Sequence, residues 1–395
     1  MTSHKCPEFV VDELLAIARK LGVQRPRLTF ESGSNRGDGF IGVVTRVVIV
    51  DEESGAEIRL ICKHLKRDPS DCEPFTTMDM FQREIFLYRR VLPEIVKLQH
   101  EKNVQQNEGF FTFPTCHFAE FNEKSQEAAL VFDDLRFEGF EMLEKTKIPD
   151  ADHVKMLMKQ LGRLHAVSFA LREQKPEILQ SFECLEDLVT KLMAKKCMLS
   201  LPRKNCRLAQ TLLRPEETHI MEHFRRWETS MWQEVAEAIA SKNAEPYAVI
   251  NHGDCWINNL MFNDSKICLL DWQTSRYGSP MLDLIYFFFT CTDKAFRDQH
   301  FRDCLDVYYD SLERLLEKLG GNAARQFPKA VMEDHLKRFA KLGMAMSTFT
   351  TPLDSGYVRE HTEEPEHVLV EANKHQYETR MRGNIMDFFS SNFMH

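Results

Sequence analysis

One stretch of the chain, residues 250–283, restricts what this sequence can fold into more than any other. An apolar run leads into His-Gly-Asp, which ends at Asp254, and Asn259 follows five residues later. Residues 260–270 hold two short apolar runs separated by the polar turn Asn-Asp-Ser-Lys, which predicts a β-hairpin. Asp271 stands at the end of the second predicted strand. The sequence therefore predicts a polar loop beside a strand end that carries another aspartate.

These polar groups match the needs of phosphoryl transfer from ATP. One carboxylate must accept the proton of the attacking hydroxyl, and we expect Asp254 in that role. A carboxylate and an amide oxygen must hold Mg²⁺ against the phosphates, and we expect Asp271 and Asn259 there. Each residue alone would be typical of a polar turn. Together, with the hairpin between them, they favour a catalytic site, provided that a nucleotide-binding lobe precedes it.

The His-x-Asp-x-x-x-x-Asn spacing, followed by a strand-borne aspartate, resembles the catalytic loop of the protein-kinase-like fold. His-Gly-Asp instead of His-Arg-Asp, Trp256 and the Asp-Trp-Gln string resemble the small-molecule kinases of that fold, such as aminoglycoside and choline kinases. The fuller strings H-G-D-C-W-I-N-N-L-M-F and L-D-W-Q-T-S-R-Y-G-S-P-M-L-D-L are most similar to the ecdysteroid-kinase-like (CHK kinase-like) family of arthropods. This resemblance runs from about residue 33 to about residue 350.

The resemblance implies an α+β, two-lobed protein-kinase-like fold with a small antiparallel β lobe and a large, mainly helical lobe. We expect residues 1–133 to form the nucleotide-binding lobe with a leading helix. Residues 134–395 then form the catalytic and substrate-binding lobe. The resemblance also implies that His252 braces the catalytic loop and that Asp283 supports it by hydrogen bonds.

A glycine-rich turn interrupts the predicted strands of residues 28–50. Gly33, Gly37 and Gly39 lie in this turn, where the missing Cβ lets backbone N–H groups approach phosphates. The spacing is not G-x-G-x-x-G, and an ordinary hairpin turn is the alternative.

A lysine and a glutamate complete the expected nucleotide site. Lys63 continues the strand predicted over residues 56–62 and is preferred to Lys66 as the phosphate-binding ammonium. The helix predicted at 78–98 carries Glu84 beside its apolar face, and the fold implies that this glutamate pairs with the lysine. Glu94 is the alternative partner, but the proline before it disturbs the helix.

The strand at residues 128–132 ends in Phe132-Asp133, which resembles the linker where the backbone meets adenine. An ordinary strand end is the alternative. Apolar periodicity predicts further helices, with one leading helix at 9–21 and others at 152–171, 215–242, 280–290, 296–319 and 333–347.

Composition excludes several classes of function. The net charge of −9 and the absence of a basic stripe argue against a nucleic-acid-binding protein. No run of about 18 apolar residues predicts a membrane span, and the polar N-terminus does not resemble a signal peptide. The eleven cysteines are scattered without a C-x-x-C motif, which favours reduced thiols and a cytoplasmic location.

The resemblance implies an ATP- and Mg²⁺-dependent phosphotransferase that acts on a hydroxyl of a small molecule, with an ecdysteroid or a similar apolar alcohol as the leading candidate. The 29 phenylalanines, against 4 tryptophans and 8 tyrosines, suit an apolar acceptor better than a cation. A choline- or ethanolamine-type kinase and a non-catalytic pseudokinase stay open, as does the oligomeric state. A protein kinase is disfavoured because the segment between Asp271 and Asp283 is too short for a peptide platform.

Overall fold

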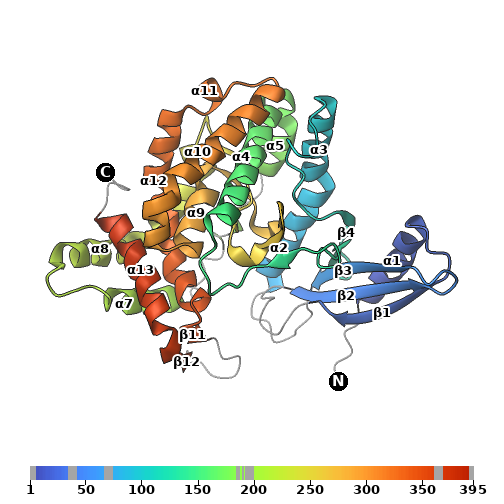
Figure 1. Ribbon diagram of the computed structural model, residues 1–395, viewed down its shortest axis with the longest axis horizontal. Coiled ribbons are helices and arrows are strands. Elements are labelled where there is room, and N and C mark those ends of the chain that lie inside the picture. Colours follow the sequence, from blue (N-terminus) through green and yellow to red (C-terminus); the bar gives the residue numbers. More distant parts are fainter. Residues whose placement is uncertain are drawn as a thin grey trace. The chain divides into compact units, whose positions relative to one another are not determined.

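The structure is a computed structural model that describes residues 6–33, 42–65, 74–183, 187–188, 191, 200–359 and 368–390 (Figure 1). The chain forms two compact units that do not follow a single cut of the sequence. The first comprises Met1–Glu94, Phe113–Glu141 and Cys268–Gln273, and the second comprises Ile95–Thr112, Met142–Ile267 and Thr274–His395. The predicted boundary at Asp133 stays a prediction.

The first unit is built on a five-stranded antiparallel sheet in the order β1-β2-β3-β5-β4. These strands form from runs rich in β-branched residues. Burial alternates from one residue to the next along a strand, as β2 shows most clearly. Their bounds are Pro26–Ser32 for β1, Gly42–Asp51 for β2, Glu57–Leu65 for β3, Cys116–Asn122 for β4 and Glu127–Asp133 for β5.

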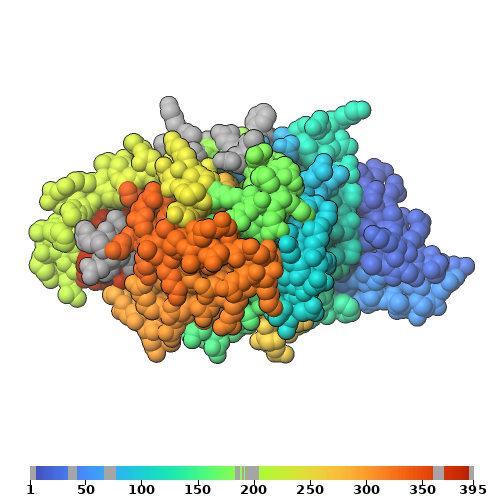
Figure 2. All heavy atoms as spheres, turned by 90° about the horizontal axis from the view of Figure 1, so that it is seen from above, coloured from blue at the N-terminus to red at the C-terminus, as the bar shows by residue number. Residues whose placement is uncertain are grey.

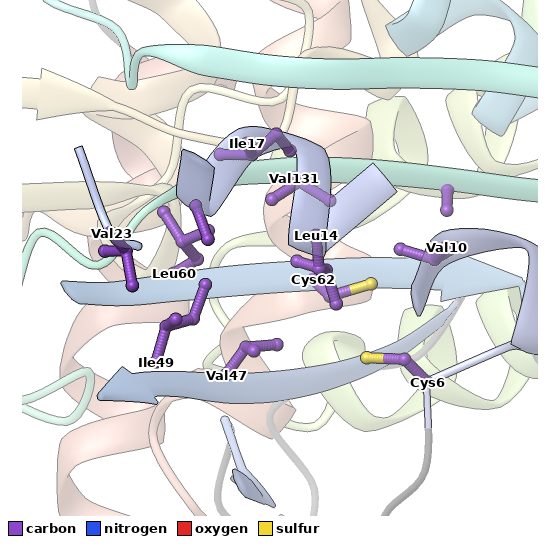
Figure 3. Close-up of a cluster of buried hydrophobic side chains, with 12 residues drawn as sticks. Cys6, Val10, Leu14, Ile17, Val23, Val47, Ile49, Leu60, Cys62 and Val131 are labelled. Carbon is purple, nitrogen blue, oxygen red and sulfur yellow. The ribbon is translucent and has the colours of Figure 1, made fainter. Parts of the chain in front are cut away.

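Helix α1 (Glu8–Lys20), the leading helix predicted at 9–21, covers one face of this sheet. Figure 3 shows its apolar side chains directed at those of the strands. Because side chains alternate along a strand, only every second residue of each strand joins this cluster. The members shown from helix and strands include Val10, Leu14, Ile17, Val47, Ile49, Leu60, Cys62 and Val131.

The same alternation directs Lys63, the neighbour of Cys62, to the opposite face, where α2 (Pro74–Phe86) packs. The helix predicted at 78–98 is split into α2, the π-helical turn η1 (Leu87–Val91) and α3 (Leu92–Glu101). Pro93 explains the π-helical turn, because its ring would clash with the carbonyl four residues earlier in a regular α-helix.

The second unit is mainly helical. Besides most of α3, its described α-helices are α4 (Ala151–Gln174), α5 (Pro176–Glu183), α7 (Ser200–Gln210), α8 (Thr218–Ile239), α9 (Met281–Cys291), α10 (Lys294–Lys318), α11 (Ala323–Gln326), α12 (Lys329–Asp354) and α13 (Lys374–Phe389). Helix α10 packs along α4, and α12 packs along α9. Every residue of α9 is buried, so it is the central helix of this unit. Figure 2 shows residues of α10 to α12, in orange, forming a continuous surface of the unit.

Short strands and turns shape the loops of the second unit. Strand β7 (Val249–Asn251) pairs with β10 (Arg276–Gly278), so the residues that follow Asn251 lie beside those that precede Arg276. The predicted hairpin is present as β8 (Leu260–Asn263) and β9 (Lys266–Leu269). The remaining short strands are β6 (Glu141–Met142), β11 (Val358–Arg359) and β12 (Val368–Leu369).

The predicted α+β class, with a small antiparallel sheet and a larger helical part, is confirmed. Among the residues that the structure describes, no helix has the length and apolarity needed to cross a membrane.

Candidate active site

Lys63 lies between two carboxylates in the first unit. Its Nζ is 2.6 Å from Glu84 Oε2 and 2.8 Å from Asp271 Oδ1. All three residues belong to this unit because its last segment, Cys268–Gln273, carries Asp271. The structure therefore brings Lys63 and Glu84 together, and it adds a contact with Asp271 that sequence reasoning had not anticipated.

Burial and charge oppose each other at this lysine. The side chain of Lys63 is 13% exposed and that of Glu84 only 2%. Burial alone would lower the pKa of Lys63, but the Asp271 and Glu84 carboxylates raise it above its ordinary value. Burial also raises the pKa of Glu84, and the lysine charge counteracts that shift. Lys63 therefore stays a cation at physiological pH.

Asp271 has an unusual backbone for a residue with a side chain. Its φ of 63° lies in the left-handed region, where non-glycine residues are uncommon and strain concentrates at functional sites. Its Oδ1 accepts from Lys63, and its Oδ2 accepts from Gln273 Nε2 at 3.1 Å. The carboxylate is thus oriented from two sides. Gln273 is a residue of the candidate site that sequence reasoning missed.

Asp254 lies in the second unit, and its carboxylate is also held from two sides. Its Oδ1 accepts the hydroxyl hydrogen of Tyr286 at 2.8 Å. Its Oδ2 accepts from Nδ2 of Asn259 at 3.0 Å, and the same amide donates to the backbone oxygen of Asp254 at 2.9 Å. Asn259 ends the short 3₁₀ turn Ile257–Asn259. The structure therefore brings the predicted Asp254 and Asn259 together.

Sequence reasoning missed Tyr286 because it belongs to the most apolar segment of the chain, Tyr286–Phe289. A signal was present, since Tyr286 lies three residues after Asp283 and shares its face of α9. Burial, the nearby charge of Asp254 and the bond to it raise the pKa of Tyr286 well above its ordinary value. The tyrosine therefore remains a protonated hydrogen-bond donor.

Asp283 holds the backbone of the candidate catalytic loop, which agrees with its expected supporting role. Its Oδ2 accepts from the N–H of His252 at 2.8 Å, and its Oδ1 accepts from the N–H of Gly253 at 2.9 Å. His165 Nε2 lies 3.5 Å from Oδ2. Burial alone would raise the pKa of Asp283, but the nearby His165, the charge of His252 and the Gly253 bond lower it. The buried carboxylate therefore stays ionised.

The loop requires glycine at position 253. Gly253 has a φ of +88°, and a Cβ there would lie 2.1 Å from the carbonyl oxygen of Thr274. The neighbouring His252 is buried, its Nδ1 accepts from the N–H of Asp254 at 3.4 Å, and its carbonyl accepts from Ser275 Oγ at 3.1 Å. These contacts account physically for the His-Gly-Asp string.

The other expected nucleotide contacts lie in the first unit. Phe132 is 8% exposed, and its ring centroid is 4.9 Å from that of Tyr88. Asp133 Oδ1 lies 2.6 Å from His117 Nε2. Burial would raise the pKa of Asp133, but the bond to His117 and its charge lower it. Their predicted contact with adenine stays a prediction.

The glycine-rich turn is described only at its start. Gly33 donates its N–H to the carbonyl of Val44 at 2.9 Å, and its own carbonyl accepts from Arg136 Nη1 at 3.1 Å. The N–H of Gly33 is thus used within the sheet. Gly37 and Gly39 lie outside the described residues, as does the alternative lysine, Lys66.

The donor set of the expected metal site suits Mg²⁺. Asp271 supplies carboxylate oxygens and Asn259 an amide oxygen, the hard oxygen ligands that this ion prefers. The Nδ2 of Asn259 is engaged by Asp254, so Oδ1 is the atom of this amide that could bind a cation. Within the described part of the chain, no group of three or more His, Cys, Asp or Glu side chains could hold a metal. Phosphate and water oxygens would have to complete the coordination shell of the Mg²⁺ ion.

The profile of the ecdysteroid kinase-like family matches residues 36–321. Among solved structures, a choline kinase from Cryptosporidium parvum Iowa II is 12% identical, covers 95% of this chain and 94% of its own, and has a TM-score of 0.46. The GDP complex of wild-type aminoglycoside 2′-phosphotransferase-IIIa is 12% identical, with 96% and 99% covered and a TM-score of 0.46. Amicoumacin kinase in complex with AMP-PNP and Ca²⁺ is 11% identical, with 97% and 96% covered and a TM-score of 0.44. No sequence among the curated proteins matches this chain.

Proposed function

This chain belongs to the ecdysteroid kinase-like family and is a kinase-type phosphotransferase, and from that premise we propose that it transfers the γ-phosphoryl group of ATP to a hydroxyl of a small molecule in the cytoplasm. The predicted family and enzyme class are confirmed. The observation that carries the proposal is the doubly held carboxylate of Asp254, which receives hydrogen bonds from Tyr286 and Asn259.

Asp254 acts on the acceptor in this proposal. Its carboxylate orients the acceptor hydroxyl and takes its proton as the hydroxyl oxygen attacks the γ-phosphorus. The bond from that phosphorus to the bridging oxygen breaks, and ADP leaves with the electron pair. Asp283 keeps the loop in place through the N–H groups of His252 and Gly253. The preformed bonds support this role because little reorganisation is then needed during the reaction.

The nucleotide is held mainly by the first unit in this proposal. Glu84 orients the Lys63 ammonium, which then meets the phosphates. Asn259 and Asp271 would hold Mg²⁺, which when bound neutralises charge on the phosphates. The glycine-rich turn would cover the phosphates, and the segment at Phe132-Asp133 would meet adenine. Residues 1–133 would then serve as the nucleotide-binding lobe and residues 134–395 as the catalytic lobe.

The acceptor in this proposal is an apolar, hydroxylated molecule such as an ecdysteroid. The family match supports a small-molecule acceptor. The excess of phenylalanine over tryptophan and tyrosine supports an apolar one, because tryptophan is the better partner for an organic cation.

Competition between acceptors tests the substrate. Ecdysone, choline, ethanolamine and an aminoglycoside are offered together with labelled ATP, and we expect the label on ecdysone. Label on choline or the aminoglycoside, with none on the steroid, would contradict the acceptor assignment and leave the phosphotransferase assignment intact.

An Asp254→Asn variant tests the mechanism. We expect kcat to fall roughly 10³-fold while the affinity for Mg-ATP changes little, because the carboxylate acts mainly in the transition state. The control is Asp264→Asn, the same change on the exposed turn of the hairpin. ATP binding is also titrated with Mg²⁺ and with EDTA, and equal affinities would indicate a non-catalytic pseudokinase.

A further inference from the structure

A group of buried polar side chains lies beyond the residues assigned so far, where the end of α12 and the middle of α13 approach α9. Asp354 ends α12 and is 5% exposed, while Thr351 in the same helix is fully buried. Arg380 lies on α13 and is 3% exposed. Charged residues are rarely buried to this extent without a partner.

Both charged groups act on α9, the helix whose Tyr286 donates to Asp254. Arg380 Nη2 donates to the carbonyl of Thr290, and Thr290 Oγ1 donates to the carbonyl of Tyr286 at 2.8 Å. Thr290 follows Tyr286 by one helical turn, which is a rise of about 6 Å. Tyr286 in turn donates to Asp254. Arg380 therefore contacts α9 at Thr290, one helical turn beyond the tyrosine that donates to Asp254.

The group has hydrogen-bonding capacity that is not used within the described residues. Arg380 Nε and Nη1 have no hydrogen-bond partner there, nor does Thr351 Oγ1. Arg380 and Asp354 are close enough to influence each other electrostatically, yet no ion pair joins them in the described part of the chain. Buried polar groups normally have hydrogen-bond partners. A buried arginine with two nitrogen atoms that lack partners therefore indicates a missing partner.

We propose that Asp354 and Arg380 form a second polar anchor for the acceptor, which binds an oxygen-bearing group other than the hydroxyl that Asp254 activates. This inference rests on the proposed function of Asp254. Arg380 donates N–H groups to a hydroxyl or carbonyl oxygen of the acceptor, and Asp354 accepts from or donates to the same group.

The charges of the anchor select the chemical class of the acceptor. A charged acceptor would be attracted by one member of this acid–base pair and repelled by the other, so the pair favours neither a cation nor an anion. The acidic Asp354 and the basic Arg380 together are suited to bind a neutral group of the acceptor. We therefore expect the acceptor to be a neutral alcohol with at least two oxygen-containing groups.

The electrostatics of Asp354 agree with this assignment. Burial raises the pKa of Asp354 to about 7, the charge of Asp254 adds to the shift, and Arg380, Thr350 and Lys145 oppose it. On α9, Tyr286 and Cys291 also feel the charge of Asp354. Near neutral pH this carboxyl can therefore both donate and accept a hydrogen bond.

An Asp354→Asn variant tests the anchor, with Asp306→Asn on the exposed face of α10 as the matched control. The probe is ecdysone, a neutral polyhydroxylated steroid. We expect KM for ecdysone to rise about 10-fold or more, with kcat and the Kd for Mg-ATP within about 2-fold of the unsubstituted protein. An unchanged KM for ecdysone overturns the inference, as does efficient phosphorylation of choline instead.

Thermal unfolding without acceptor separates binding from a structural role. If Asp354 serves the acceptor, Asp354→Asn leaves Tm at pH 8 unchanged or raises it. If Asp354 and Arg380 form a structural ion pair, the substitution leaves a buried charge unpaired and Tm falls by several degrees. A fall in Tm therefore overturns the inference even if no acceptor is phosphorylated. Failure of the proposed function is seen separately, as absent Mg-ATP binding or absent transfer by the unsubstituted protein.

Discussion

Tyr286 donates its hydroxyl hydrogen to Asp254 Oδ1 at 2.8 Å, and this bond links the carboxylate of the candidate catalytic loop to the most buried helix of the second unit. The same helix holds the loop backbone through Asp283, one turn earlier. One buried helix therefore fixes both the path of the loop and the direction of its carboxylate. A site of this kind depends on groups that are rigid before the substrate arrives.

The first prediction concerns this bond. A Tyr286→Phe substitution keeps the ring and removes only the hydroxyl, so we expect kcat to fall about 10-fold with little change in the KM for ATP. Tyr309→Phe is the control, because Tyr309 donates a comparable bond to the carbonyl of Phe327 at 3.0 Å outside the candidate site. Steady-state kinetics of both variants give kcat and the KM for ATP. Equal effects of the two substitutions on kcat would contradict the role of Tyr286.

The second prediction compares two glycines with the same backbone conformation. Gly253 and Gly320 both have φ of +88°, but a Cβ at 253 would collide with the Thr274 carbonyl, whereas none of the described atoms lies within 4 Å of a Cβ at 320. Gly320→Ala should therefore lower the free energy of unfolding by roughly 1 kcal/mol, from backbone strain alone.

Gly253→Ala should destabilise the protein by at least about 2 kcal/mol more and abolish turnover, because the loop must move to relieve the clash. Denaturant unfolding and kcat are measured for both variants. A Gly253→Ala protein as stable and active as Gly320→Ala would show that the loop is not held as the structure indicates.

The third prediction concerns the buried cation of the first unit. Lys63→Met should lower kcat/KM for ATP by roughly 10²-fold, since a fixed positive charge near the phosphates is lost. Lys20→Met, the same change at an exposed position of α1, is the control. Glu84→Gln should have a smaller effect in the same direction, because the lysine keeps Asp271 as a partner. If Glu84→Gln lowered kcat/KM for ATP more than Lys63→Met, that result would contradict the roles assigned to Lys63 and Glu84.

The fourth prediction follows from the raised pKa of Asp354. In the unfolded chain an aspartate has a pKa of about 3.9, whereas burial raises it to about 7 in the folded protein. Between these values the folded protein binds more protons than the unfolded chain. The stabilisation from this carboxyl is therefore fully present below about pH 4 and is lost as the pH rises towards 7.

Asp354→Asn removes this dependence, so the Tm of the variant relative to the unsubstituted protein should increase between pH 5 and pH 8. Thermal unfolding across that range measures the difference, with Asp306→Asn as a control that should show no such trend. A difference that stays constant or decreases with pH would mean that Asp354 does not titrate in this window.

Local patterns in the sequence predicted much of the fold. The alternation of apolar residues indicated the strands of the first unit, and the 3.6-residue period indicated α1, α4, α9, α10 and α12. The π-helical turn before α3 could not be placed from periodicity, because a π-helical turn shifts the pattern by only one residue. The two-unit division also escaped prediction in detail, since residues 95–112 belong to the second unit and residues 268–273 to the first.

The sequence by itself determined the family and the enzyme class, and it identified His252, Asp254 and Asn259 as candidate catalytic-loop residues, because they lie within eight residues and their spacing is visible in one dimension. Only the tertiary structure decided which distant residues meet them. Lys63 contacts Asp271 across 208 residues, and Tyr286 reaches Asp254 across 32. Such contacts arise when helices and strands pack, and no local period records them, so Tyr286, Gln273 and the Asp354–Arg380 group became recognisable only in the folded chain.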